Sequence, residues 1–149
     1  MRFVVQVTSE ASVAVEGETT GAIRKGFVVL IGIENADTTK TADKMIKKLL
    51  GLRIFPDENG KTNLNLEQVG GGLLLISQFT LYADCRHGNR PSFTGAGAPD
   101  HAKELYEYII AKCRESGIGT QTGRFGADMQ VKLVNEGPFT LIMDSKELV

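Results

Sequence analysis

Two uninterrupted apolar runs limit what this chain can fold into more than any other feature. FVVLIGI at residues 27–33 and LLLISQF at residues 73–79 are each as long as one strand and offer few polar side chains to water. This pattern predicts two strands that are buried on both faces. The fold therefore has to provide a covering layer on each side of the sheet that contains them.

Two segments have the periodicity of amphipathic helices that can form one of those layers. Apolar residues recur at helical spacing over residues 42–50 and again over residues 102–113. Thr38 or Thr39 can cap the first helix, and Asp100 can cap the second. The charged residues of the first helix that fall off its apolar stripe are interpreted as a solvated face: Lys44, Lys47 and Lys48.

Shorter strand-like segments occur at residues 3–7, on either side of Gly17, at residues 52–55 and beyond residue 119. Two helices can cover only one face of a sheet, so a second sheet layer or a partner subunit is expected on the other face. The 149 residues suit a single domain. The sequence thus predicts one α/β domain over residues 1–149, a layered sandwich of mixed β-sheet (ββα layers) with two main helices.

Composition narrows the functional classes. The formal net charge is -1, whereas a general nucleic-acid binder carries a clear basic excess, so any contact with nucleic acid is expected to use a small local patch and DNA is not an expected partner. The two cysteines do not form a disulfide framework. Neither a signal peptide nor a run of about 20 apolar residues is apparent. We therefore expect a cytoplasmic protein without a membrane partner.

The polar end of the second apolar run is the first candidate for a site. It places Ser77, Gln78 and Thr80 directly before a long Gly/Pro-containing stretch at residues 84–99. Long loops in compact domains are often functional, and hydroxyls, an amide and free backbone N–H groups at a strand end can line a polar pocket. On spacing alone, a sheet edge with polar residues facing water is the favoured interpretation.

Nucleophile and metal patterns are weak. Thr80 would need a nearby base, and the only histidines are His87 and His101, without a carboxylate arrangement that fixes a triad. Cys85 and His87 point in opposite directions on an extended loop. The two cysteines and two histidines could supply four zinc ligands, but their spacing does not support a zinc site, and Cys113 fits the apolar stripe of its helix. No metal and no cofactor are expected.

Three arginines, Arg86, Arg90 and Arg124, lie in glycine-containing loops. Such side chains can bind phosphates, or they can be solvated surface. Their positions alone do not distinguish these alternatives.

Near the end of the chain, NEGPFT at residues 135–140 separates two apolar alternating runs. A tight turn between neighbouring strands is the common connection at such a place. Proline is an awkward residue there, because it has no N–H to donate to a ladder. Gly137-Pro138 therefore needs another explanation.

Taken together, SQFTLYADCRHGNRPSFTGA, TGRFGADMQV and NEGPFT, in this order and spacing, closely resemble the D-aminoacyl-tRNA deacylases, also called D-tyrosyl-tRNA deacylases. The similarity extends from MRFVVQVTSEASV through LRIFPDENGKTNLN to LIMDS, which is essentially the whole chain. Its two signature segments, SQ-x-x-L and N-x-G-P-x-T, are specific as a pair.

The resemblance implies a homodimer with active sites at the subunit interface. It implies hydrolysis of the ester that joins a D-amino acid to the 3′-terminal adenosine of tRNA, with Gly-tRNA as a further substrate. Gly137 and Pro138 would form a Gly-cisPro motif that enters the pocket of the other subunit and excludes an L side chain.

The resemblance also assigns roles to the other segments. Ser77, Gln78, Phe79 and Thr80 would form the catalytic segment, with backbone N–H groups near Phe79 and Thr80 as an oxyanion hole. The adenine would pack on two residues of the GRFGADM segment, Phe125 and Met129. No side chain is implied as a required nucleophile, and the terminal ribose 2′-OH is implied to assist.

One position departs from the family pattern. An arginine usually follows the glutamine of the first strand and helps to hold the Gly-Pro carbonyls, whereas here Gln6 is followed by Val7. Two alternatives are therefore kept beside D-aminoacyl-tRNA hydrolysis. One is an editing deacylase that acts on mischarged L-aminoacyl-tRNA, and the other is a non-catalytic module that binds the tRNA 3′ end.

Overall fold

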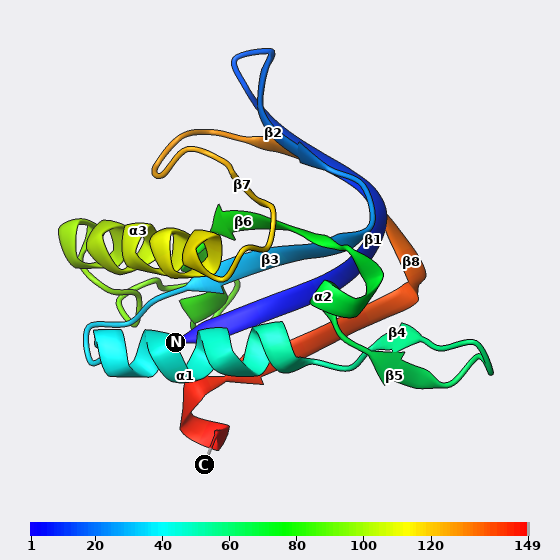
Figure 1. Cartoon of the computed structure of the whole chain (residues 1–149). Coiled ribbons are helices and arrows are strands. Elements are labelled where there is room, and N and C mark those ends of the chain that lie inside the picture. The colour runs from blue at the N-terminus through cyan, green and yellow to red at the C-terminus, as the bar shows by residue number, and fades with distance from the viewer. Residues whose placement is uncertain (149) are drawn as a thin grey trace.

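The computed structural model describes residues 1–148, which form one six-stranded mixed sheet with two long helices against it (Figure 1). The strand order is β2-β1-β3-β6-β7, and β8 also pairs with β1. The strands of this sheet are β1 (Arg2–Val15), β2 (Glu18–Ile23), β3 (Gly26–Gly32), β6 (Gly72–Ser77), β7 (Thr120–Thr122) and β8 (Gln130–Asp144). The pairs β3–β6 and β6–β7 are parallel, and the pairs made by β1 are antiparallel. The predicted mixed α/β class is confirmed.

The remaining elements are shorter, apart from the two main helices. The helices are α1 (Thr39–Gly51), α2 (Leu66–Val69) and α3 (Pro99–Glu115), with 3-10 turns η1 (Phe79–Tyr82) and η2 (Ser145–Glu147). A small second sheet pairs β4 (Phe55–Pro56) with β5 (Thr62–Leu64). The strand predicted at residues 52–55 is therefore wrong in its first three positions. Within residues 1–148, no helix combines the length and the apolar character needed to cross a membrane.

The central strands β3 and β6 are buried on both faces, as the two apolar runs predict. Alternate residues of these strands enter two separate cores. The larger core lies beneath α1 and α3 and receives Phe27, Val29, Ile31, Leu73 and Leu75. The smaller core lies on the opposite face and receives Val28, Leu74 and Ile76.

The second covering layer comes from the same sheet. The first half of β1 pairs with β3, and its second half pairs with β2, while β8 follows β1 along nearly its whole length. The strand bends between these partners (Figure 1), and Ala11 and Val13 then close the smaller core together with Val131 and Leu133. The prediction of separate strands at residues 3–7 and before Gly17 is wrong, because one 14-residue strand spans both.

The helix boundaries follow from their first residues. Thr38 caps α1 through a capping box with Thr41, as predicted. In α3, however, Ala98 occupies the cap position and Pro99 the first helical position, so Asp100 lies inside the first turn and is not the cap. Proline suits this position because the N–H that it lacks has no intrahelical partner there.

Near its middle, β8 leaves the ladder with β1. Gln6 is opposite Thr140 and Thr8 is opposite Asn135, so β1 has one residue, Val7, where β8 has four. Residues 136–139 are therefore extruded from the sheet, and we call them the β8 tip. NEGPFT is not a turn between neighbouring strands, because the chain rejoins the same ladder after the tip.

Candidate functional site

A pocket of about 570 Å³ lies at one end of β3 and β6. Four segments meet around it: the end of β3, the end of β6 with the two residues that follow, the loop before α3 with the first turn of that helix, and the loop between β7 and β8. Among the lining residues are Ile31, Ile33, Ser77, Gln78, Phe79, Phe93, Gly97, Pro99, Phe125 and Met129. Five of the predicted site residues, Ser77, Gln78, Phe79, Phe125 and Met129, thus lie around one cavity.

The second apolar run changes conformation inside this pocket. As a strand β6 ends at Ser77, and the backbone N–H of Gln78 still donates to the Ile31 carbonyl at 2.8 Å. The next backbone bond runs from the N–H of Leu81 to the Gln78 carbonyl, at 3.2 Å, and opens η1. The N–H groups of Phe79 and Thr80 precede the helical bonds and donate to no other group within residues 1–148.

The side chain of Gln78 fixes Thr80. Its Nε2 donates to Thr80 Oγ1 over 2.5 Å in a partly buried position. The hydroxyl of Thr80 thereby accepts an amide N–H, and Thr80 is not among the residues that line the pocket. The ring of His101 is engaged elsewhere, since its Nε2 donates to the Asp37 carbonyl at 3.0 Å.

Aromatic rings flank both sides of the pocket. Phe79 is 56% exposed and meets Phe93 edge to face with ring centroids 5.4 Å apart. Across the pocket, Phe125 lies 6.0 Å from Tyr106, whose hydroxyl donates to the Leu75 carbonyl of β6 at 2.7 Å. Burial raises the pKa of Tyr106 to about 12, so this donor stays protonated. The ring of Phe125 is thus supported by the core of the protein, whereas that of Phe79 contacts Phe93 and is more than half exposed.

The position of the Met129 side chain requires that residue 123 has no side chain. A Cβ at Gly123 would overlap Met129 Sδ and would approach Ile76. The same sulfur accepts a 3.4 Å hydrogen bond from the backbone N–H of Arg124. The loop from residue 123 to residue 129 is therefore folded around the methionine and presents it to the pocket beside Phe125.

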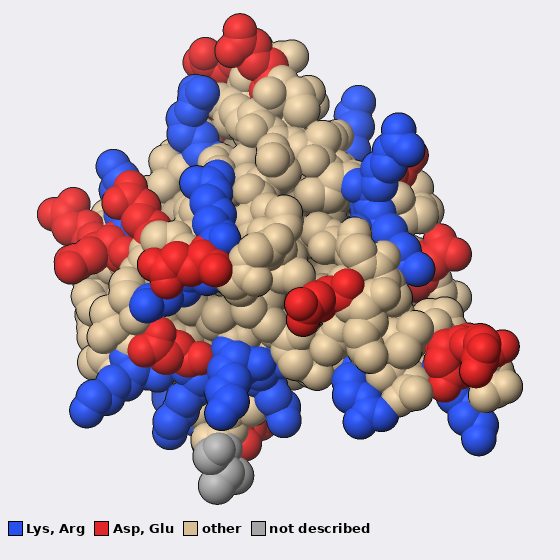
Figure 2. Space-filling model, in the orientation of Figure 1, with Lys and Arg blue, Asp and Glu red and all other residues tan. Residues whose placement is uncertain are grey.

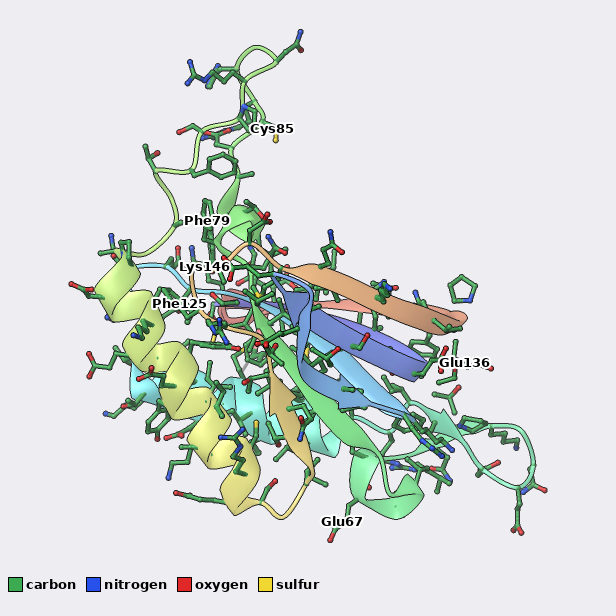
Figure 3. The ribbon with its side chains drawn as sticks, turned by 90° about the horizontal axis from the view of Figure 1, so that it is seen from above. Glu67, Phe79, Cys85, Phe125, Glu136 and Lys146 are labelled. Atoms are coloured by element: carbon green, nitrogen blue, oxygen red, sulfur yellow. The ribbon has the colours of Figure 1, made fainter. Side chains whose placement is uncertain are left out.

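The cysteines and histidines do not form a site together. Cys85 and His87 are exposed on the loop after η1 and are not among the residues that line the pocket. Figure 3 shows Cys85 on this loop, beyond Phe79. Cys113 is buried in the larger core, as its helical position predicts, and burial raises the pKa of its thiol to about 11. Within residues 1–148, no three His, Cys, Asp or Glu side chains are arranged to hold a metal ion.

The loop arginines are placed differently from one another. Arg86 binds Asp84 through two hydrogen bonds of 2.8 and 2.7 Å, which lower the pKa of Asp84 to about 2. Arg90 lies exposed on the same loop, and Arg124 is exposed next to Phe125. Of the three, only Arg124 is next in the chain to a residue that lines the pocket, Phe125.

The β8 tip is distant from the pocket of its own chain. In Figure 3, Glu136 marks the tip at one end of the sheet, and Phe79 and Phe125 lie toward the other end. Gly137 and Pro138 are exposed, and the peptide bond between them is cis, the conformation that the resemblance implies. One chain therefore brings together the predicted catalytic segment and the Phe125–Met129 loop but does not bring the Gly-Pro pair to them.

Side-chain amides close the base of the β8 tip. Asn135 Oδ1 accepts from the N–H of Phe139 at 3.0 Å, and Asn135 Nδ2 donates to Thr140 Oγ1 at 3.0 Å. Gln6 Nε2 also donates to Thr140 Oγ1, at 3.3 Å. Val7, opposite the tip, is buried in the larger core and supplies no polar group.

Sequence reasoning misses several residues of this site. Phe93 is the single aromatic residue in the polar stretch 84–99, which is the available signal for it. Tyr106 is predicted only as part of an apolar helix stripe, because its contact to Phe125 joins segments distant in sequence. Gly123 gives no signal, since close approach to a side chain cannot be read from a glycine alone.

Comparison with known proteins places these features in one family. The family model described as D-Tyr-tRNA(Tyr) deacylase matches residues 4–144. A D-aminoacyl-tRNA deacylase of Shewanella baltica (strain OS185) is 58% identical over 140 residues, which cover 94% of this chain and 97% of the relative. A D-aminoacyl-tRNA deacylase of Desulfatibacillum aliphaticivorans is 54% identical over 98% of this chain and the full length of the relative.

Solved structures share the fold over nearly the whole chain. The c-Myc DNA unwinding element binding protein superposes with a TM-score of 0.90 at 37% identity, covering 97% of this chain and 98% of the other. A structure described as a probable eukaryotic D-amino acid tRNA deacylase superposes with a TM-score of 0.79 over 95% of this chain and 97% of the other. At 16% identity, the second similarity concerns the fold alone.

Proposed function

The chain belongs to the D-aminoacyl-tRNA deacylase family and is a hydrolase of that activity, and we propose that its pocket cleaves the ester between a D-amino acid and the terminal adenosine of tRNA. The observation that carries this proposal is the meeting of two segments in one pocket. Ser77 ends β6 there and is followed by Gln78 and Phe79, and Phe125 and Met129 line the same pocket. One segment offers donors for an ester, and the other offers an apolar surface for a base.

The adenine rests on Phe125 and Met129. Stacking of a base on an aromatic ring is worth about 1–3 kcal/mol and does not depend on fine hydrogen-bond geometry. The contact from Tyr106 to Phe125 supports this role, because it holds the ring in place before the substrate binds.

The ester carbonyl is polarised by the backbone N–H groups of Phe79 and Thr80. Within residues 1–148 both are free of intramolecular bonds, which is what an oxyanion hole requires. Water attacks the carbonyl carbon, the bond to the ribose oxygen breaks, and that oxygen takes up the proton that the water loses. The neighbouring ribose 2′-OH assists this transfer, and no side-chain nucleophile takes part. Thr80, already bonded to Gln78, positions the segment.

Selection for the D configuration comes from a second subunit. The β8 tip of one protomer enters the pocket of its partner, where Gly137 and Pro138 occupy the space that an L side chain would need. The exposure of both residues and their distance from the pocket of their own chain support a homodimer. The outward face of β8 supports it as well, since Val134 and Ile142 are apolar yet 47% and 75% exposed in one chain. Side-chain identity is not read, so many D-amino acids are substrates, and glycine is cleaved too.

Two other functions stand as alternatives. Cleavage of mischarged L-aminoacyl-tRNA has one observation in its favour, which is that Val7 gives the β8 tip no charged donor. The bonds made by Asn135 and Gln6 supply neutral donors and acceptors at the base of the tip and favour D selection. A non-catalytic module that binds the tRNA end would use the same pocket without hydrolysis. Both cysteines are free, which suits the reducing cytoplasm where we place the reaction.

One assay separates these functions. Purified protein is incubated with D-Tyr-tRNA, D-Asp-tRNA, Gly-tRNA and L-Tyr-tRNA, and the remaining ester is measured over time. We expect comparable cleavage of the two D-aminoacyl-tRNAs, measurable cleavage of Gly-tRNA and almost none of L-Tyr-tRNA. Preferred cleavage of L-Tyr-tRNA would establish the L-editing function, and binding without any cleavage would establish the non-catalytic one.

A further inference from the structure

We propose that one face of α1 binds the phosphate backbone of the RNA duplex that continues from the 3′ end held in the pocket. This face, the α1 lysine face, consists of Lys40, Lys44, Lys47 and Lys48. The inference rests on the proposed function, because it names the surface that the same tRNA substrate uses outside the pocket.

The four lysines lie on the side of α1 directly opposite its buried stripe. Their spacing of i, i+4, i+7 and i+8 keeps them in one row along the helix. All four are exposed, whereas the stripe of Ala42, Met45, Ile46 and Leu49 is buried in the core. Figure 2 shows basic side chains gathered along the lower edge of the molecule, where α1 runs in Figure 1.

These lysines are not neutralised by the protein. Within residues 1–148, none of the four has a carboxylate oxygen within 4.0 Å, although Lys112 pairs with Glu115 and Lys146 with Glu34. Asp43, the single acidic residue of α1, accepts a hydrogen bond from the Tyr108 hydroxyl at 2.8 Å. A chain with a formal net charge of -1 thus concentrates positive charge on one helix.

The α1 lysine face begins close to the pocket. Pro99 lines the pocket, and His101, two residues later, donates to the carbonyl of Asp37, three residues before Lys40. Ile33 also lines the pocket, and residues 34–38 connect it to the start of α1 at Thr39. From Lys40 the row of lysines leads along the helix for about 12 Å, at about 1.5 Å per residue.

The chemistry of the face fits RNA phosphates. Neighbouring lysines are about 5–6 Å apart, so their flexible ammonium groups can follow successive phosphates of one strand. A membrane surface fits less well, because helices that lie on membranes insert large apolar side chains. The large apolar side chains that are exposed within residues 1–148 are Phe79, Phe93, Val134 and Ile142, and none lies on α1.

The test compares a triple variant with a matched control of equal charge change. The variant carries Lys40→Gln, Lys44→Gln and Lys47→Gln, and the control carries Lys25→Gln, Lys61→Gln and Lys112→Gln. Glutamine has nearly the helix propensity of lysine, so α1 is retained. Each protein is assayed with D-Tyr-tRNA at several salt concentrations and with 3′-O-D-tyrosyl-adenosine, which has no phosphate.

For the variant we expect a KM for D-Tyr-tRNA about tenfold or more above wild type, with kcat little changed. The slope of log(1/KM) against log[salt] should fall by about 1 for each phosphate that a lysine no longer neutralises, a total of about 2–3. Cleavage of D-tyrosyl-adenosine should equal that of wild type, and the control triple variant should behave as wild type with both substrates.

Three results would overturn the inference. The first is an equal loss in the variant and the control, because general charge would then be responsible. The second is an equal loss with D-tyrosyl-adenosine, which would indicate damage to the pocket. The third is wild-type cleavage of D-Tyr-tRNA by the variant together with lost binding to phosphatidylserine vesicles, which would assign the face to a membrane. Inactive wild-type protein would instead refute the proposed function on which the inference rests.

Discussion

The pocket and the β8 tip are built in opposite ways. Residues that line the pocket are supported by contacts with the core. For example, Tyr106 contacts the ring of Phe125 and donates a hydrogen bond to the backbone of β6. The β8 tip is extruded from its ladder, is exposed, and is held at its base by the side-chain bonds of Asn135, Gln6 and Thr140. One chain is therefore enough to form the surface of the pocket. The tip, in contrast, projects from the sheet and is supported at its base.

This contrast indicates that the pocket and the tip have different tasks in the proposed reaction. In the proposed reaction, catalysis would rely on groups that the folded chain has already positioned, such as the free N–H groups at the start of η1. Chiral selection would rely on a short projection that lies away from the pocket of its own chain. Substitutions at the two places should consequently alter different quantities.

The largest effect is expected when the tip and the pocket are kept apart. Ile142→Lys places a charge on the outward face of β8, where the isoleucine is 75% exposed in one chain. An unpaired charge in an interface costs several kcal/mol, so the dimer dissociation constant should rise by about a thousandfold or more. Sedimentation should show monomers at micromolar concentration, and deacylation of D-Tyr-tRNA should fall at least about a hundredfold.

Two controls show whether the loss of activity comes from dissociation of the dimer and not from unfolding. Because Ile142 is exposed in the single chain, the monomer should keep its fold and its circular dichroism spectrum. Glu58→Lys on the β4–β5 hairpin, an exposed position away from β8, should leave both assembly and activity unchanged. A fully active monomeric Ile142→Lys protein would refute the shared site.

A smaller effect, confined to selectivity, is expected at the base of the tip. Asn135→Ala removes the acceptor for the Phe139 N–H and the donor to Thr140. Two hydrogen bonds are together worth about 1–3 kcal/mol, so the ratio of D-Tyr-tRNA to L-Tyr-tRNA cleavage should fall about tenfold or more. Asn135→Asp keeps the acceptor and should give an intermediate ratio.

Two outcomes for the Asn135 variants would contradict this prediction. If kcat for D-Tyr-tRNA falls as much as the selectivity ratio, the tip contributes to chemistry and the division between chemistry and selection is wrong. An unchanged ratio would mean that the tip is positioned by contacts with the partner subunit alone.

The sequence predicts the pocket better than the tip, for a physical reason. Runs of apolar residues indicate buried strands, so the pattern predicts strands at residues 27–33 and 73–79, where β3 and β6 lie. The second prediction is wrong in its last two residues, because β6 ends at Ser77. The bend of β1 is not predicted from the sequence. A strand that changes its pairing partner midway has no sequence pattern of its own.

The sequence of the tip is unusual, but the periodicity of apolar residues does not predict its structure. A Gly-Pro pair between two apolar runs indicates a break in a ladder, but not that the chain rejoins the same ladder after four residues. That outcome depends on the pairing with β1, which is distant in sequence. The predicted cap of α3 is wrong for a simpler reason, since Asp100 and Pro99 both favour the first turn and proline takes the earlier position.

Gly123→Ala should produce a moderate loss confined to the pocket. The added Cβ would overlap Met129 Sδ, and overpacking of this kind costs about 1–3 kcal/mol. If the methionine supports the adenine, KM for D-Tyr-tRNA should rise about tenfold while the D/L ratio stays constant. Gly51→Ala, at a position where an added Cβ meets nothing within 4 Å among the described residues, should change neither value. A changed D/L ratio in Gly123→Ala would show that the pocket takes part in chiral selection.

The smallest effect is expected for Cys85→Ala and His87→Ala, which should each retain wild-type deacylation within about threefold. Both side chains are exposed on the loop after η1 and outside the residues that line the pocket. Loss of an essential nucleophile or base would cost about a thousandfold or more, so the assay with D-Tyr-tRNA decides clearly. A substrate whose terminal ribose carries hydrogen in place of the 2′-OH should be cleaved far more slowly by all three proteins. If instead either variant were inactive and the 2′-deoxy substrate were cleaved normally, the protein would use a side-chain nucleophile, and the free N–H groups of Phe79 and Thr80 would not be sufficient for catalysis.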